Sequence, residues 1–97
     1  MKIFISQPMR GKTDEQIEME RDKVVQKLQD KYGGIEILDT IFDLEVGTPP
    51  LVYLGKSIEV LAQADLAYFM KGWDKARGCV IEYECATRYG IKVEEEE

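Results

Sequence analysis

Residues 64–93, which read ADLAYFMKGWDKARGCVIEYECATRYGIKV, contain a strand, a loop, a helix and a second strand in succession. The apolar run Ala64–Phe69 predicts a buried strand, and Met70–Ala76 has the glycine and the mixed charges of a loop. Helical spacing of apolar and small residues predicts a helix from about Arg77 to Tyr89. Ile91–Val93 then predicts a short final strand.

The upstream part of the chain shows the same alternation. Lys2–Ser6 predicts a buried strand, and a capping box at Thr13–Gln16 predicts a helix that ends at the glycine pair 33–34. Ile35–Asp39 predicts a second strand. Pro49-Pro50 predicts the start of a second helix, whose apolar stripe consists of Leu51, Leu54, Ile58, Leu61 and Ala62. The alternation of strands and helices over residues 1–97 indicates one domain with a parallel, doubly wound sheet.

Composition excludes several classes of function. The chain has 97 residues, with 13 basic and 19 acidic side chains, and the resulting net charge of −6 disfavours binding to a nucleic-acid polymer. It has no histidine, which removes imidazole acid–base catalysis and most catalytic zinc sites. The apolar runs are too short to cross a membrane or to form a secretory signal, so we expect a cytoplasmic protein. Residues 94–97 are all glutamate and predict a solvated, frayed acidic tail.

The last predicted helix contains two glutamates with different neighbours. Glu84 has Arg88 four residues on, so we interpret Glu84 as one half of a surface ion pair. On the helix face of Glu82 the neighbours are small and uncharged: Gly78, Cys79, Cys85 and Ala86. They leave room beside the carboxylate for another group, although Glu82 facing solvent is an equally good interpretation of the spacing. The two cysteines are expected to be reduced packing residues.

Two loops follow predicted strands at the sheet edge where ligands bind in such folds. The first, Ser6–Lys12, precedes a helix N-terminus, and its Arg10 and Lys12 are either anion-binding residues or ordinary surface charges. In the second, Lys71–Gly78, Trp73 is either a lid for a flat ligand or, more commonly for a lone tryptophan, part of the core. Asp65 precedes a buried strand, which favours a structural role in capping.

These segments carry a resemblance to a known family. Asp65–Phe69, Gly78–Ala86 and Gly90–Val93 resemble the nucleoside 2-deoxyribosyltransferases, whose pattern is an alanine–aspartate strand, a Gly-x-x-x-Glu-x-Gly-x-Ala helix and a Gly-Lys-x-Val strand. The opening Ile3–Pro8 is similar to that family's Ile-Tyr-Leu-Ala-Gly-Pro start. More closely, nearly the whole chain resembles the short branch of this superfamily called domain of unknown function 4406. The resemblance implies a flavodoxin-like, Rossmann-like three-layer α/β fold with a parallel sheet of about four strands.

The resemblance also implies a reaction. In the family, the glutamate at the position of Glu82 attacks the anomeric carbon of a 2-deoxyribosyl group and displaces the base. Three positions depart from the family. Phe4 replaces a tyrosine, Ser57 replaces a sugar-binding aspartate, and Ala76 replaces an aspartate that helps the base to leave. With Ala76 in that place, Asp74 is the nearest acidic candidate for proton transfer, and Ser57 with Arg10 or Arg77 suits a 5′-monophosphate.

We therefore carry two hypotheses forward. The first is an enzyme that cleaves or transfers the N-glycosidic bond of a 2-deoxyribonucleoside or its 5′-monophosphate, with no metal or organic cofactor. The second is a non-catalytic module that binds a nucleotide or nucleotide-sugar, and a purely structural domain is a third, less favoured one. The partner expected in both is a small molecule, and the open sheet edge favours a homodimer or a larger homo-oligomer. The catalytic candidates are Glu82 and Asp74, and the substrate-binding candidates are Ser6, Gln7, Pro8, Met9, Arg10, Gly11, Ser57, Gly72, Trp73, Arg77 and Gly78.

Overall fold

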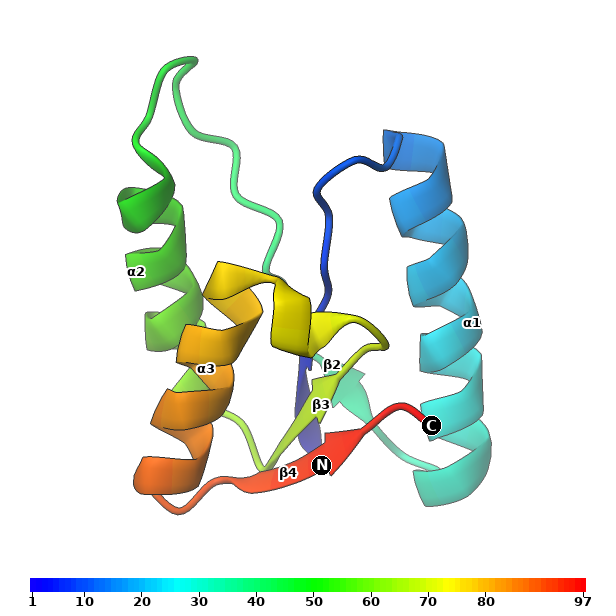
Figure 1. Cartoon of the computed structure of the whole chain (residues 1–97). Coiled ribbons are helices and arrows are strands. Elements are labelled where there is room, and N and C mark those ends of the chain that lie inside the picture. The colour runs from blue at the N-terminus through cyan, green and yellow to red at the C-terminus, as the bar shows by residue number, and fades with distance from the viewer.

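The computed structural model describes all 97 residues as three helices packed around one sheet (Figure 1). The order is strand, helix, strand, helix, strand, short 3-10 helix, helix and strand. The elements are β1 (Lys2–Ser6), α1 (Asp14–Tyr32), β2 (Glu36–Ile37), α2 (Pro50–Leu61), β3 (Leu66–Phe69), η1 (Trp73–Lys75), α3 (Arg77–Arg88) and β4 (Lys92–Glu95).

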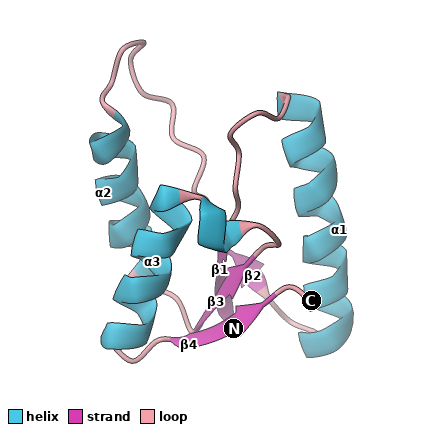
Figure 2. Cartoon of the chain, in the orientation of Figure 1, coloured by secondary structure: helices cyan, strands magenta, loops and turns pink.

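The four strands form one parallel sheet in the order β2-β1-β3-β4. Helix α1 lies on one side of this sheet, and α2 and α3 lie together on the other (Figure 2). The predicted α/β class, a three-layer arrangement with a parallel sheet of four strands, is confirmed. Because α1 and α3 follow the neighbouring strands β1 and β3 but cover opposite faces, the carboxyl ends of these two strands flank the crevice where such folds bind ligands.

Alternate residues of the central strands supply two hydrophobic cores. Ile3 and Ile5 of β1 point toward α1 and pack with its Val24 and Leu28. Phe4 points to the other face and packs with side chains of β3, α2 and α3, among them Phe69, Leu61 and Ala86. Burial on both faces explains why β1 and β3 are apolar runs without alternation. It also places Ser6, two residues after Phe4, on the α2–α3 side.

Local signals in the sequence set the ends of α1. The Thr13 hydroxyl accepts a hydrogen bond from the backbone N–H of Gln16, and the Gln16 side chain accepts one from the backbone N–H of Thr13, so the predicted capping box is confirmed. The helix ends at Gly33, whose φ of 77° is the left-handed conformation that glycine adopts without strain. Asp65 is structural as predicted, since its carboxylate accepts a hydrogen bond from the backbone N–H of Lys2.

Strand β2 is shorter than predicted, and α2 is less buried than its apolar stripe predicts. Only Glu36 and Ile37 of the predicted strand 35–39 pair with β1, because the chain then turns into the irregular segment that leads to α2. In α2 the predicted apolar stripe is buried only at its carboxyl end. Leu61 is buried, whereas Leu51 is 74% exposed and Ala62 is also exposed. The amino-terminal turn of α2 therefore presents apolar side chains to solvent.

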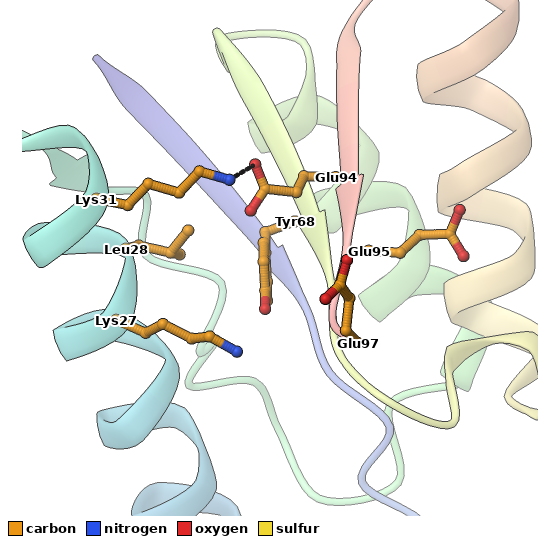
Figure 3. A pocket seen from close by; sticks show the side chains of 7 residues that line it. All are labelled: Lys27, Leu28, Lys31, Tyr68, Glu94, Glu95 and Glu97. Atoms are coloured by element: carbon orange, nitrogen blue, oxygen red, sulfur yellow. Dashed lines mark hydrogen bonds and ion pairs between the residues drawn. The ribbon is translucent and has the colours of Figure 1, made fainter.

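The prediction of a frayed acidic tail is wrong. Strand β4 includes Glu94 and Glu95, and the backbone N–H of Glu96 continues the pairing by donating to the carbonyl of Phe69 over 2.9 Å. Glu94 forms an ion pair with Lys31 and accepts a hydrogen bond from the Tyr32 hydroxyl, and Glu94 and Lys31 line a cavity of about 190 Å³ beside Tyr68 (Figure 3). These contacts with α1, together with hydrogen bonds from the loop after β3, explain why an all-glutamate segment is ordered.

The same segment anchors the loop that follows β3. In Figure 3 the side chain of Glu95 points away from α1, on the opposite side from Glu94. There it accepts a hydrogen bond from Trp73 Nε1, and Glu96 accepts one from the backbone N–H of Lys71. The loop is therefore held by the end of the chain. None of the three helices combines the length and the apolar character that crossing a membrane requires.

Candidate active site

Glu82 of α3 and Ser6 of β1 meet at the carboxyl end of the sheet. Ser6 is the last residue of β1, and its Oγ donates a hydrogen bond of 2.6 Å to Glu82 Oε1 in a buried setting. Glu82 is only 8% exposed, although its helix lies on the surface of the molecule. The interpretation of Glu82 as a solvent-facing residue is therefore wrong. The space left by its small neighbours is occupied by the Ser6 hydroxyl.

Burial is the dominant influence on the Glu82 carboxylate. It raises the pKa of Glu82, since removal from water disfavours the charged form, while the hydroxyls of Ser6 and Ser57 act in the opposite direction. A position near the N-terminus of a helix by itself favours the ionised form of a carboxyl. The pKa of Glu82 is nevertheless raised, because the effect of burial is larger than that of the hydroxyl donors around the carboxylate.

Glu84 differs from Glu82 as the sequence indicated. Its side chain is exposed, and Oε1 accepts a hydrogen bond of 2.7 Å from Arg88 Nε, four residues on. Such an exposed pair contributes little to stability, about 0.3–0.5 kcal/mol. Two glutamates in one short helix therefore have separate environments, and only one of them is shielded from water.

Cys79 also lies beside the Ser6–Glu82 pair. Its thiol is buried, and both burial and the Glu82 charge raise the pKa of Cys79, while the Ser6 hydroxyl lowers it. Both Cys79 and Cys85 are free thiols, and Cys85 packs against the α2–α3 core. The expected packing role of the two cysteines agrees with these positions. No group of three or more histidine, cysteine, aspartate or glutamate side chains is arranged as a metal site.

A cavity of about 550 Å³ opens between the amino-terminal turns of α2 and α3. It brings together three residues that the sequence singled out separately, Ser57, Arg77 and Gly78. The remaining lining is mostly apolar and comes from Pro49, Pro50, Leu51, Tyr53, Leu54 and Ile81. Glu82 does not line this cavity. Ser57 connects the two, since it lines the cavity and its hydroxyl lowers the pKa of Glu82.

The cavity also lies at two helix N-termini. Neither α2, which begins after Pro49, nor α3, which begins after Ala76, has a side-chain hydrogen bond that caps its first turn. The start of α2 offers fewer donors than that of α3, because Pro49 and Pro50 have no N–H and the N–H of Val52 bonds the carbonyl of Pro49. At α3 the free backbone N–H groups and the helix dipole favour an anion. With the guanidinium of Arg77 at the same place, this part of the cavity suits a phosphate or a carboxylate.

The loop after β1 turns toward α1 rather than toward this cavity. Gln7 is buried and donates a hydrogen bond of 2.8 Å from Nε2 to the carbonyl of Ile17 in α1. Lys12 pairs with Glu20 of α1 over 2.8 Å, and with Pro8 it lines a separate cavity of about 200 Å³. The other three candidates of this loop, Met9, Arg10 and Gly11, are exposed. A binding role for this loop stays a prediction.

The loop after β3 is packed on the protein's own aromatic side chains. Trp73 stacks on Tyr83 of α3 and contacts Phe69, so it packs against the core as one interpretation of the sequence expected. A role for Trp73 in binding a ligand stays a prediction. Gly72 has a φ of 90° and turns the chain beside Pro8. Asp74 is exposed and makes no hydrogen bond, which leaves its side chain free to move.

Sequence reasoning missed Arg21 and the apolar lining of the larger cavity. Arg21 Nη2 donates to the Thr40 hydroxyl over 3.3 Å, while its Nη1 is buried without a partner. The sequence does indicate that Arg21 is partly buried, because it lies four residues after Ile17 and three before Val24, on the apolar face of α1. The position of Tyr53 and Ile81 at one cavity depends on how α2 and α3 pack, which local patterns do not encode.

A family model described as "Domain of unknown function (DUF4406)" matches residues 1–95. The chain belongs to this DUF4406 family. The match includes every element of the sheet and every residue of the Ser6–Glu82 site. No curated protein and no solved structure matches the chain. The family is therefore known, while the link from DUF4406 to the nucleoside 2-deoxyribosyltransferases still rests on the resemblance in sequence.

Proposed function

We propose that the protein cleaves or transfers the N-glycosidic bond of a 2-deoxyribonucleoside or its 5′-monophosphate, with Glu82 as the nucleophile. The observation that carries the proposal is the buried carboxylate of Glu82, which is hydrogen-bonded to Ser6 beside a cavity with an anion-binding end. A carboxylate shielded from water and held by a donor is the kind of group that forms covalent glycosyl intermediates. The sequence resemblance to nucleoside 2-deoxyribosyltransferases supports the same residue.

The reaction has two steps. In the first, a carboxylate oxygen of Glu82 bonds to the anomeric carbon of the sugar as the bond from that carbon to the base nitrogen breaks. The bonding electrons leave with the base, which takes up a proton. In the second, water or another base attacks the same carbon, the ester bond to Glu82 breaks, and the attacking group loses a proton. Two displacements at one carbon retain its configuration.

The larger cavity favours a 5′-monophosphate over the free nucleoside. The uncapped N-terminus of α3 and Arg77 supply donors for a phosphate. The wall formed by Tyr53, Leu54 and Ile81 suits the flat, partly apolar base and sugar. Charge-assisted hydrogen bonds of this kind contribute about 1.5–3 kcal/mol each. Arg77 is therefore a better candidate than Arg10, because Arg77 lines this cavity and Arg10 does not.

The departing base requires a proton, and Asp74 is the acid that we assign to this step. It lies on η1, immediately before α3, and its side chain makes no hydrogen bond in the free protein. Approach of a substrate is needed to remove it from water and to make it an effective donor. No metal or organic cofactor takes part in this proposal.

A non-catalytic module that binds a nucleotide or nucleotide-sugar is the second candidate. The observation in its favour is the absence of a carboxylate at the N-cap of α3, where Ala76 stands, together with the exposed position of Asp74. In such a module Glu82 accepts hydrogen bonds from sugar hydroxyls. The two candidates share the cavity and differ in whether a bond breaks.

The deciding experiment is incubation of the protein with a panel of 2-deoxyribonucleosides and their 5′-monophosphates, with and without a second base. Chromatography measures the free base and any new nucleoside. Release of base by the wild-type protein supports the enzyme. Binding detected by calorimetry without release of base from any compound supports the module.

We also propose that the protein acts as a homodimer or a larger homo-oligomer. Besides Leu51, several large apolar side chains are exposed along the segment before α2, on α2 and on α3: Ile41, Val46, Val52, Tyr53, Val80 and Ile81. Exposed apolar side chains on neighbouring elements of a small protein are typical of an interface. Sedimentation equilibrium tests this expectation, and a monomer at all concentrations contradicts it.

A further inference from the structure

The carboxylate of Glu82 receives one hydrogen bond, and its donor is 76 positions away in the chain. Ser6 Oγ lies 2.6 Å from Glu82 Oε1, and Ser6 is only 1% exposed. A short bond between a hydroxyl and a carboxylate away from water is among the stronger hydrogen bonds in proteins. Because a hydroxyl has a single proton, this bond commits the Ser6 proton to Glu82. Ser6 is therefore not available as a proton donor to a substrate.

Ser6 is a rigid point from which to hold another side chain. It pairs with Phe69 across the two central strands, and its carbonyl accepts a hydrogen bond of 2.9 Å from the backbone N–H of Met70. Its side chain has one heavy-atom torsion, whereas that of Glu82 has three. A bond between them therefore restricts the glutamate much more than it restricts the serine.

The hydrogen bond engages only one of the two carboxylate oxygens. Glu82 Oε2 has no hydrogen-bond partner, and it is not among the polar atoms that are sealed from solvent without one. The groups that face the carboxylate are Ser6 of β1, Ser57 of α2 and Cys79 of its own helix. No charged side chain contributes to the pKa of Glu82. The two hydroxyls alone oppose the effect of burial, and the effect of Ser6 is the larger.

We propose that Ser6 is the positioning residue for Glu82: its hydroxyl holds Oε1 in one orientation and leaves Oε2 free to form the bond to the sugar. The catalytic half of this inference rests on the proposed function. The structural half, that Ser6 orients the carboxylate and stabilises its ionised form, does not. Each half has its own measurement.

The structural half is tested by carboxyl-carbon NMR of protein labelled at glutamate, with Glu82→Gln used to assign the Glu82 resonance. We expect the titration midpoint of Glu82 to move to higher pH in Ser6→Ala, since the donor that favours the charged form is gone. Thr87→Ala, which removes a hydroxyl bonded to the carbonyl of Tyr83 on the exposed side of the same helix, serves as the control with no shift. An unchanged midpoint in Ser6→Ala overturns the proposal whether or not a substrate is found.

The catalytic half is tested by kinetics with Ser6→Ala and with Ser6→Thr, which keeps a hydroxyl. We expect Ser6→Ala to lower kcat by about tenfold or more with little change in KM, and to move the acid limb of the pH profile to higher pH. Ser6→Thr restores most of the rate. An equal loss of rate in both variants with an unchanged pH profile indicates a packing role and overturns the proposal. If the titration midpoint of Glu82 shifts in Ser6→Ala but the wild-type protein releases no base, the proposed function is contradicted. The inference that Ser6 orients the Glu82 carboxylate is supported by the same result.

Discussion

The indole ring of Trp73 stacks on the phenol ring of Tyr83, with the ring centroids 4.2 Å apart and 19° between the planes. Tyr83 in turn meets Phe69 edge to face at 5.0 Å. These three rings join the end of β3, the 3-10 helix and α3. Since Tyr83 follows Glu82 directly in the sequence, the cluster also fixes the turn of α3 that contains the candidate nucleophile.

We expect Trp73→Ala to lower the free energy of unfolding by about 2–3 kcal/mol. Truncation of a fully buried tryptophan to alanine lowers the free energy of unfolding by about 3–5 kcal/mol. The expected loss is smaller here, because Trp73 is only half-buried. Trp73→Phe, which keeps an aromatic ring over Tyr83, should retain most of the stability. Urea denaturation followed by circular dichroism measures both. Unchanged stability in Trp73→Ala, combined with weaker nucleotide binding, would point instead to a mobile lid.

Glu82→Gln should abolish release of base, because the amide has no negative charge with which to attack the anomeric carbon. The fold should be retained, since glutamine fills the same volume beside Ser6. Glu84→Gln is the matched control from the same helix. It loses only the exposed pair with Arg88 and should keep nearly full activity. Equal turnover by the wild-type protein and Glu82→Gln would remove Glu82 as nucleophile and favour the binding module.

The raised pKa of Glu82 predicts a pH-dependent difference in stability between the wild type and Glu82→Gln. A carboxyl whose folded pKa is above its unfolded value contributes stability below the unfolded pKa, and that contribution is lost as pH rises through the folded pKa. Glu82→Gln should therefore become more stable relative to the wild type as pH rises above about 4, the pKa of glutamate in an unfolded chain, until the pH exceeds the folded pKa. Melting temperatures across this range give the difference. A constant difference contradicts the assignment of a raised pKa to this group.

Arg77→Ala should weaken binding of a 2-deoxyribonucleoside 5′-monophosphate by about 1–3 kcal/mol, which is a factor of about 5–150. The affinity for the matching nucleoside should change little, because it has no phosphate for the guanidinium to bind. Arg10→Ala is the control, since Arg10 has the same charge but does not line the cavity. Calorimetric titration measures all three proteins. Equal affinity of the wild type for both ligands would reject a phosphate subsite at Arg77.

The rate of base release should pass through a maximum as a function of pH. As pH falls from 8, protonation of the leaving base becomes easier and the rate rises. The rate then falls when Glu82 becomes protonated, and burial places this acid limb at a higher pH than for an exposed glutamate. In Asp74→Asn the rise toward lower pH should be smaller. A flat profile from pH 5 to 8 that is identical in both proteins excludes Asp74 as the acid.

The sequence by itself determined the order and type of the elements. The apolar runs of β1 and β3, the capping box at Thr13, and the proline pair before α2 are local signals, and each produced the element that it predicts. The sequence also distinguished the environments of Glu82 and Glu84, because helical spacing shows that Arg88 can pair with Glu84. These features depend on residues within about four positions of one another.

Only the tertiary structure decided what surrounds those residues. The donor to Glu82 is Ser6, which helical spacing around Glu82 does not reveal, because the contact depends on α3 packing against the end of β1. The same is true of Glu94, whose partners Lys31 and Tyr32 lie on α1 and convert a predicted tail into strand β4. The physical reason is that burial and long-range pairing set the energy of a charged group. Its neighbours in the sequence describe only the helix or strand on which it lies.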